Sequence, residues 1–258
     1  MIGFTIKKWF FDYWDNFFLF GLINIGFLVL IALPLYGTLP FAETAPLLGL
    51  VISSIGIMIL FMYTGAVHKI AFLVAKYQKP EWKDFFQSFK PMIKPSLLIG
   101  ALWLFVAITL FFVFPFYLSL ESILGVGALA FLFWMTILWT LASQYFFPVY
   151  CQLDQQLAKT LRKSFILFFD NGGFSFFMLV FKVIILGLSG FTAFLMLGPG
   201  SIILMSEVMV KLRLYKYDYL EENPEVKRSQ IPWRVIMMED DERVGKRTLR
   251  GMIFPWKE

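Results

Sequence analysis

Apolar residues along this chain are gathered into long, uncharged runs separated by short polar connections. Four such runs cover residues 17–36, 47–66, 96–118 and 124–149, and none of them contains Asp, Glu, Lys or Arg. A helix needs about 20 predominantly apolar residues to cross the roughly 30 Å hydrocarbon layer of a bilayer. The pattern therefore predicts four transmembrane helices.

A fifth apolar stretch, residues 174–210, is too long for one ordinary span and short for two. We predict two short spans, 174–188 and 191–210, with the turn between them at residues 189–190. The Gly-Pro-Gly triplet at 198–200 would then kink or break the sixth span, because proline removes a backbone donor. The alternative is five spans with a re-entrant element at this triplet.

The distribution of basic residues predicts the orientation, since cytoplasmic loops carry the excess of Lys and Arg. The loop 37–46 and the turn around Glu121 contain no basic residue, so we expect both to face outward. The other connections are rich in Lys and Arg, and 11 more basic residues follow Val210. Both termini are therefore predicted to lie in the cytoplasm. The basic residues that precede Val210 on this inner side are Lys7, Lys8, Lys69, Lys76, Lys79, Lys83, Lys90, Lys94, Lys159, Arg162 and Lys163.

The connection between the second and third spans has the pattern of an amphipathic helix. Pro80 stands at a first helical position, and Glu81 and Asp84 in the first turn favour the positive end of the helix dipole. Aromatic residues recur at three-to-four spacing and form one stripe, and the lysines lie off it. This stripe either lies in the membrane interface or packs on the cytosolic ends of neighbouring spans. Its residues are Trp82, Phe85, Phe86 and Phe89.

The connection between the fourth and fifth spans shows the same arrangement. Its apolar stripe includes Leu161 and Phe165 and is preceded by Asp154. The Asn-Gly-Gly sequence at 171–173 is typical of a helix C-terminus. We therefore predict a second cytoplasmic amphipathic helix, anchored at the interface by Leu161 and Phe165.

The two connections match each other at a shift of 76 residues. We interpret the match as a tandem duplication of a unit made of a span, an interfacial helix and a span. The alternative is chance similarity between two amphipathic helices. The matched pairs are Lys83 with Lys159, Ser88 with Ser164, and Phe89 with Phe165.

Composition agrees with a membrane protein, because 59% of the residues are apolar and 16% are charged. Soluble domains have about 45–50% apolar and about 25% charged residues. One Cys and one His exclude a disulfide framework and a histidine-rich metal site within a single chain. No phosphate-binding loop, serine elbow or zinc-hydrolase motif occurs, so we predict neither an enzyme nor a cofactor. The inward-facing basic loops explain the net charge of +5, and we expect no nucleic acid as a partner.

Short aromatic and basic motifs stand at the inner ends of the predicted spans. They are Gly65-Ala66-Val67-His68-Lys69, Trp82-Lys83-Asp84-Phe85-Phe86-Gln87-Ser88-Phe89-Lys90, Tyr145-Phe146-Phe147-Pro148 and Leu161-Arg162-Lys163-Ser164-Phe165. Over roughly residues 10–215 the chain resembles the YesL-like bacterial membrane proteins, a family defined by a domain of unknown function. The resemblance implies a multi-pass protein of the bacterial cytoplasmic (inner) membrane that accompanies a carbohydrate uptake system. It implies no catalytic or ligand residues, and the charged tail of this chain is longer than the family pattern.

Charges inside the membrane are costly and therefore mark candidate sites. Lys182 and Glu207 are the only charged residues within the predicted spans and form our candidate intramembrane polar site. We expect Lys182 near the middle of its span and Glu207 near the cytoplasmic end, where its carboxylate can reach the interface. The two hypotheses are a structural pair and a ligand or ion site. His68 is expected to be a satisfied or headgroup-facing imidazole.

The chain is thus predicted to be an all-α, polytopic transmembrane helix bundle at residues 1–212 with a charged cytoplasmic tail at 213–258. In the tail an acidic run at 239–242 precedes a basic cluster and the aromatic sequence at 254–256. Such a tail binds anionic headgroups, the protein's own cytosolic helices or a partner.

We expect an accessory or scaffold component of a transport system, in contact with the lipid bilayer and with a membrane-protein partner such as a permease. The alternative is a small transporter or lipid-handling protein in its own right, which the repeat and Lys182 motivate.

Overall fold

The computed structural model describes residues 2–41, 43–228, 230–245 and 247, and this part of the chain is helical without strands. The all-α fold is therefore confirmed. The helices are α1 (Ile2–Asp15), α2 (Phe17–Tyr36), α3 (Pro46–Ala75), α4 (Trp82–Ile108), α5 (Phe114–Leu118), α6 (Ile123–Ser143), α7 (Phe146–Gln152), α8 (Leu157–Asp170), α9 (Gly172–Phe191), α10 (Pro199–Glu222), α11 (Trp233–Ile236) and α12 (Met238–Val244).

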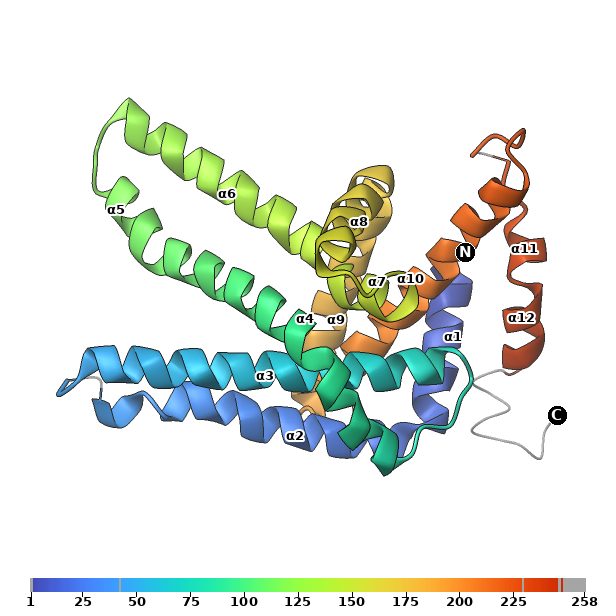
Figure 1. The fold of residues 1–258 in the computed structure, drawn as a ribbon, viewed down its shortest axis with the longest axis horizontal. Helices are drawn as coiled ribbons and strands as arrows, with labels where there is room; N and C mark the ends of the chain where they lie inside the picture. Colours follow the sequence, from blue (N-terminus) through green and yellow to red (C-terminus); the bar gives the residue numbers. More distant parts are fainter. Residues whose placement is uncertain (1, 42, 229, 246, 248–258) are drawn as a thin grey trace.

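Two long helical hairpins diverge from a common base (Figure 1). The first hairpin is α2 with α3. The second is α6 with α4, which continues through one π-helical turn, η2 (Thr109–Val113), into α5. In the described part of the chain, five helices are long and apolar enough to cross a membrane by length and composition, namely these four arms and α9. The polytopic membrane bundle predicted from the apolar runs is confirmed.

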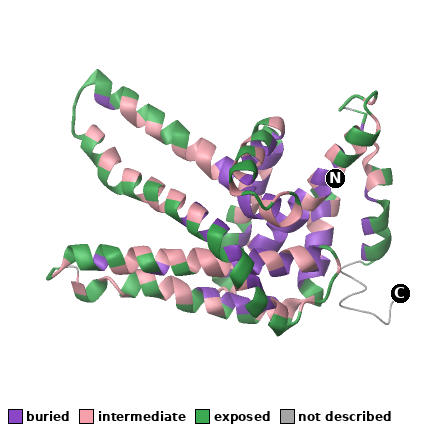
Figure 2. Cartoon of the chain, viewed as in Figure 1, coloured by how far each residue is buried: buried purple, intermediate pink, exposed green. Residues whose placement is uncertain are grey.

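The packed core lies at the base of the hairpins rather than along them. Figure 2 shows buried residues gathered at the base and mostly exposed or partly buried ones along the arms. In α3, all buried residues other than Gly49 and Gly56 lie between Gly65 and Ala75. Because α3 has 30 residues, it is about 45 Å long, so about a third of its length extends beyond the roughly 30 Å hydrocarbon layer. Lipid thus covers the arms, and protein side chains cover the remaining third.

The turn between α9 and α10 differs from the predicted turn at 189–190. The helix α9 runs on to Phe191, and residues 192–198 form the turn, with Ala193 and Phe194 at positive φ. Asn24 holds this turn: its Nδ2 donates to the carbonyl of Leu195 at 3.3 Å, and its Oδ1 accepts from the amide of Gly200 at 2.9 Å. Asn24 lies in the first half of α2, so the turn does not reach the far ends of the hairpins.

The expected sixth span at 191–210 is therefore not observed, because residues 192–198 form a turn and the next helix starts at Pro199. The helix α10 starts at Pro199, so the Gly-Pro-Gly triplet begins a helix instead of kinking one. Gly200 has to be small, because a Cβ atom there would lie 2.9 Å from Asn24 Oδ1. Protein side chains bury α10 on nearly all sides between Gly200 and Leu214, so it can carry charges that a lipid-facing helix could not. It also runs past residue 212, so the boundary expected between bundle and tail falls inside a helix.

The first amphipathic connection is not a separate interfacial helix but the first part of α4. Helix α4 continues through Pro91 and Pro95. Proline at 95 leaves the carbonyl of Pro91 without its helical donor, and the Tyr150 hydroxyl donates to that carbonyl at 3.5 Å. The amphipathic segment and the predicted third span thus form one continuous helix.

The aromatic stripe of this segment divides between the two alternatives. Phe85 is buried, with 6% of its surface exposed, and its ring lies 5.6 Å from the ring of Tyr63 on α3. Phe89 packs partly buried beside it. Phe86 is 68% exposed and Trp82 is also exposed, so these two are free to enter the interface.

The second amphipathic connection is a separate helix, as predicted. Helix α8 ends at Asp170, and Leu161 and Phe165 are partly buried against the base. In this duplication α3 corresponds to α6 and α7 together. A shift of 76 residues places the start of α3 one residue before the start of α6, and the end of α3 one residue before the end of α7. The matched residues Ser88 and Ser164 are both buried, and each donates to the carbonyl four residues earlier. These agreements support the tandem duplication.

The C-terminal segment packs against the N-terminal helix. Helix α12 lies on α1 (Figure 1), and Arg247 forms two hydrogen bonds with Asp15, at 2.7 and 2.8 Å. Both ends of the described chain thus lie on the same side of the hairpins. The aromatic end of the tail at 254–256 lies outside the described residues.

Replacing Phe85 by Asp should lower the free energy of unfolding by about 2–4 kcal/mol, because a buried ring is lost and an unpaired charge is buried. Phe86→Asp is the matched control and should change unfolding little while weakening association with lipid vesicles. Thermal unfolding in detergent and vesicle flotation measure the two effects. Equal destabilisation by both variants would show that the stripe is not divided.

Reporter fusions at the two ends of the chain should give the same compartment, and that compartment should be the cytoplasm. The contact between α1 and α12 requires the shared side, and the positive-inside rule gives its identity. A reporter inserted beside Glu121 should give the opposite compartment. Opposite signals from the two termini would contradict the observed packing of α12 on α1.

Candidate functional site

A buried carboxylate at the centre of the base joins α3 and α7 to α10. Glu207 on α10 has no exposed surface, and its Oε1 lies 2.7 Å from Nδ1 of His68 on α3. Its Oε2 accepts a hydrogen bond from Nε2 of Gln152 on α7 at 2.7 Å. The same Gln152 nitrogen also donates to the Glu207 carbonyl at 3.1 Å. Both carboxylate oxygens are therefore occupied, one from each half of the duplication.

The imidazole of His68 is fixed from its other side. Its ring stacks on Phe147 with centroids 4.7 Å apart and planes 25° from parallel. An ionised carboxylate can only accept, so Nδ1 of His68 is the donor in the pair with Glu207. Stacking and hydrogen bonding together hold the ring in one orientation.

Lys182 belongs to the same polar region but makes a weaker contact. It is partly buried on α9, and its Nζ donates to Oε1 of Gln144 at 3.4 Å. Gln144 in turn donates to the carbonyl of Ser175 at 2.9 Å. Among the described side chains no direct ion pair joins Lys182 to Glu207, although the two charges attract each other. We call His68, Gln144, Gln152, Lys182 and Glu207 the polar cluster.

The polar cluster brings together the two predicted site residues and corrects one expectation about them. Glu207 does not reach the interface but is enclosed and hydrogen-bonded. Lys182 lies midway along α9, as expected, yet at the level of Gln144 near the end of α6. Because α9 crosses beside the ends of the hairpins, the middle of this helix is not the middle of a long arm.

Sequence reasoning did not assign His68, Gln144 and Gln152 to the site. It expected His68 to be a satisfied or headgroup-facing imidazole; the buried bond to Glu207 agrees with the first alternative, but the partner was not identified. One signal was available, because the shift of 76 residues places His68 on Gln144. Corresponding positions of a duplicated unit commonly face the same central element.

Chemically, the Glu207 carboxylate of the polar cluster is enclosed and hydrogen-bonded at both oxygens. A buried carboxylate needs hydrogen bonds to its oxygens, and Glu207 has them from His68 on α3 and Gln152 on α7. In the described part of the chain, no group of three or more His, Cys, Asp or Glu residues could hold a metal ion. The arrangement is suited to fastening α3, α7 and α10 together.

A second ionic group fastens the C-terminal half of α10 to α8. The Asp170 carboxylate accepts from Lys216 at 2.8 Å and from the Tyr217 hydroxyl at 2.5 Å, and Arg228 contacts its other oxygen. Burial alone would raise the pKa of Asp170, but these hydrogen bonds and positive charges outweigh burial and lower the pKa to about 2. Asp170 therefore stays ionised at any physiological pH.

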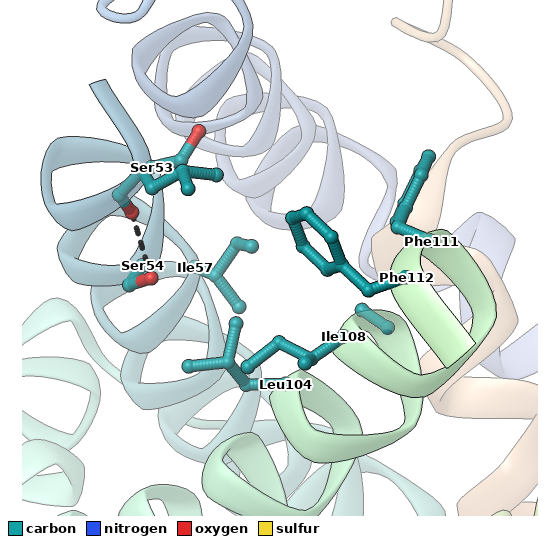
Figure 3. A pocket seen from close by; sticks show the side chains of 9 residues that line it. Ser53, Ser54, Ile57, Leu104, Ile108, Phe111 and Phe112 are labelled. Atoms are coloured by element: carbon teal, nitrogen blue, oxygen red, sulfur yellow. Dashed lines mark hydrogen bonds between the residues drawn. The ribbon is translucent and has the colours of Figure 1, made fainter. Parts of the chain in front are cut away.

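A pocket lies between the hairpins, away from the polar cluster. It has a volume of about 430 Å³ and opens between α3 and the α4–η2 arm (Figure 3). The hydroxyls of Ser53 and Ser54 donate to the carbonyls of Pro34 and Leu50, so neither donor is free for a ligand. We call this the apolar groove. Its lining residues are Leu50, Ser53, Ser54, Ile57, Leu104, Ala107, Ile108, Phe111 and Phe112.

No family model, curated protein or solved structure matches this chain.

Replacing Glu207 by Leu should destabilise the protein by about 2–4 kcal/mol, because His68 and Gln152 then lose their buried acceptor. Lys182→Met should change the free energy of unfolding by less than about 1 kcal/mol, since Lys182 is partly exposed and makes one long hydrogen bond. Thermal unfolding of both variants in the same detergent tests the difference. A folded Lys182→Met protein that has lost a bound solute or its cellular role would instead show that Lys182 acts in a ligand site.

Proposed function

We propose that this protein is a non-catalytic membrane scaffold, an accessory component that holds a partner membrane protein of a transport system. The observation that carries the proposal is the apolar groove between two hairpins whose large side chains face outward. Phe111 is 78% exposed, and Phe112 and Ile108 are exposed beside it. A transmembrane helix of a partner can pack against such side chains through van der Waals contacts.

The closed polar cluster supports a scaffold over a transporter. A transport site needs groups that exchange water or protein contacts for a solute, and the groups around Glu207 are already paired with one another. The cavity beside Cys151 and Tyr150 has a volume of only about 20 Å³. The hydrogen bonds of the polar cluster favour a rigid base that keeps the two hairpins apart.

The resemblance to the YesL-like family supports the finer part of the proposal. It suggests a permease of a carbohydrate uptake system as the partner and the bacterial cytoplasmic membrane as the location. The excess of basic residues in the connections at the base supports cytoplasmic termini.

A lipid-handling protein is the second candidate, and the same groove favours it. The lining is apolar, its two serine hydroxyls are engaged, and its volume of about 430 Å³ can hold part of an acyl chain. The two candidates differ in the occupant of the groove and can be separated by identifying it.

A photo-crosslinking amino acid placed at Phe111 in living cells should give a discrete adduct with another membrane protein. The matched control is the same amino acid at Phe18, which is 85% exposed on α2 but is not among the groove residues. Mass spectrometry of the adducts identifies the occupant. A protein adduct from Phe111 alone supports the scaffold.

The other outcomes decide against it. A phospholipid adduct enriched at Phe111 over Phe18 would favour the lipid-handling candidate. Identical adducts at both positions would mean that the groove has no preferred occupant, and both candidates would then fail.

A further inference from the structure

The C-terminal segment inserts one carboxylate among cations and phenols at the base. Asp240 on α12 is buried, and its Oδ1 accepts from Lys211 of α10 at 2.8 Å. Its Oδ2 accepts from the Tyr215 hydroxyl at 2.8 Å, and its carbonyl accepts from Tyr77 at 3.4 Å. Lys8 of α1 stands on the remaining side. We call Lys8, Tyr77, Lys211 and Tyr215 the anion cage.

Lys8 is buried in the anion cage and only partly neutralised by Asp240. Its side chain has no exposed surface, and its ammonium lies 2.8 Å from Asp12 and 3.6 Å from the ring centre of Tyr77. The distance from Lys8 Nζ to Asp240 Oδ1 is 3.6 Å, which is too long for a hydrogen bond. Without α12 the cage would hold two ammonium groups against the single carboxylate of Asp12. A larger anion could contact Lys8 and Lys211 at once.

Burial makes these charges sensitive to what occupies the cage. Burial lowers the pKa of Lys8 and raises that of Asp12 to about 6, although the two attract each other. For Asp240, burial alone would raise the pKa, but the charge and hydrogen bond of Lys211 outweigh it and lower the pKa. An ionised acceptor is therefore the preferred occupant.

Two buried apolar side chains hold α12 and its flank in place, Met237 of the hydrophobic core just before the helix and Val244 within it. The helix has seven residues, of which only Asp240 and Val244 are buried. Lys7 donates to the Gly245 carbonyl at 3.0 Å, Arg243 lies over the exposed side of Tyr77, and Arg247 pairs with Asp15 at the surface. A segment held mainly by ionic contacts opens more readily than one held by a hydrophobic core.

The anion cage lies where phosphate groups are available. Tyr77 follows the end of α3 by two residues, and Lys211 donates to the carbonyl of Ala75 at that end. A helix about 45 Å long that starts at one surface of a bilayer ends close to the headgroup layer of the other, since bilayers are about 40–45 Å thick including headgroups. Both lipid phosphates and phosphate in solution can reach this level.

We propose that the anion cage is a phosphate-binding site whose resident occupant is Asp240, and that α12 lifts off when a phosphate group takes its place. The phosphate belongs either to an anionic lipid headgroup or to a free anion. Helix α12 is then a displaceable cover over Lys211 and Tyr215 of α10. This proposal is independent of the occupant of the apolar groove.

Hydrogen exchange of the full-length protein in nanodiscs tests the displacement. Exchange of backbone amides at 237–245 should rise at least tenfold when inorganic phosphate replaces NaCl at equal ionic strength, or when phosphatidylglycerol is added to phosphatidylcholine discs. A response to phosphate identifies a free anion as a source, and a response to phosphatidylglycerol identifies the headgroup. Identical exchange under all these conditions would overturn the proposal and make α12 a permanent part of the fold.

Matched variants test the competition directly. Asp240→Asn should bind inorganic phosphate at least tenfold more tightly than the wild type in equilibrium dialysis, because the competing charge is gone. Asp241→Asn changes an exposed neighbour in the same helix and should bind like the wild type. Equal phosphate affinity in Asp240→Asn and the wild type would contradict displacement. The exchange experiment on the wild type decides the question even if the Asp240 variant does not fold.

Discussion

The hydrogen bonding of one buried carboxylate to groups on α3 and α7 is the interaction on which the base depends. Glu207 could not be enclosed as an ion without His68 and Gln152, because an unpaired buried charge costs several kcal/mol. Conversely, α3 and α7 have no other shared polar acceptor on α10 in the described structure. The charge therefore specifies how α10 lies between the hairpins, while the surrounding apolar side chains supply most of the packing energy.

The sequence predicts the arms well because lipid imposes a simple rule on them. A helix segment surrounded by acyl chains has to be apolar along its whole length, so α2, α6 and the part of α3 before His68 appear as uncharged runs. Helix α10 escapes this rule, since protein rather than lipid surrounds Glu207 and Lys211. Its position depends on contacts such as that of Asn24 with Gly200, which are separated by 176 residues. Pairings of this kind leave no periodic signal.

Only the charged residues of the candidate site could be predicted from the sequence, for the same reason. Lys182 and Glu207 stand out because charges are rare in apolar runs, whereas His68 and Gln152 lie at boundaries where polar residues are ordinary. The first amphipathic segment and the third span were predicted as separate elements, whereas the structure joins them in one helix through Pro91 and Pro95. The duplication is informative in another way: its second copy is interrupted near Gln144 and at Asn171, where its first copy is continuous. The interruptions coincide with the two polar groups that fasten α10.

Helix α3 acts mechanically as a single rod. It contains no proline after Pro46 and no break up to Ala75, and sharp bends in helices are almost always associated with such features. One end of α3 borders the apolar groove at Leu50 and Ser53. Near the base, the hydrogen bond from His68 to Glu207 fastens α3 to α10. At the other end, the carbonyl of Ala75 accepts a hydrogen bond from Lys211. A tilt of about 5° about the base would move the far end of a rod with about 30 Å beyond its pivot by about 3 Å. A sub-ångström rearrangement where the termini meet would thus be magnified at the mouth of the groove, as by a lever with unequal arms.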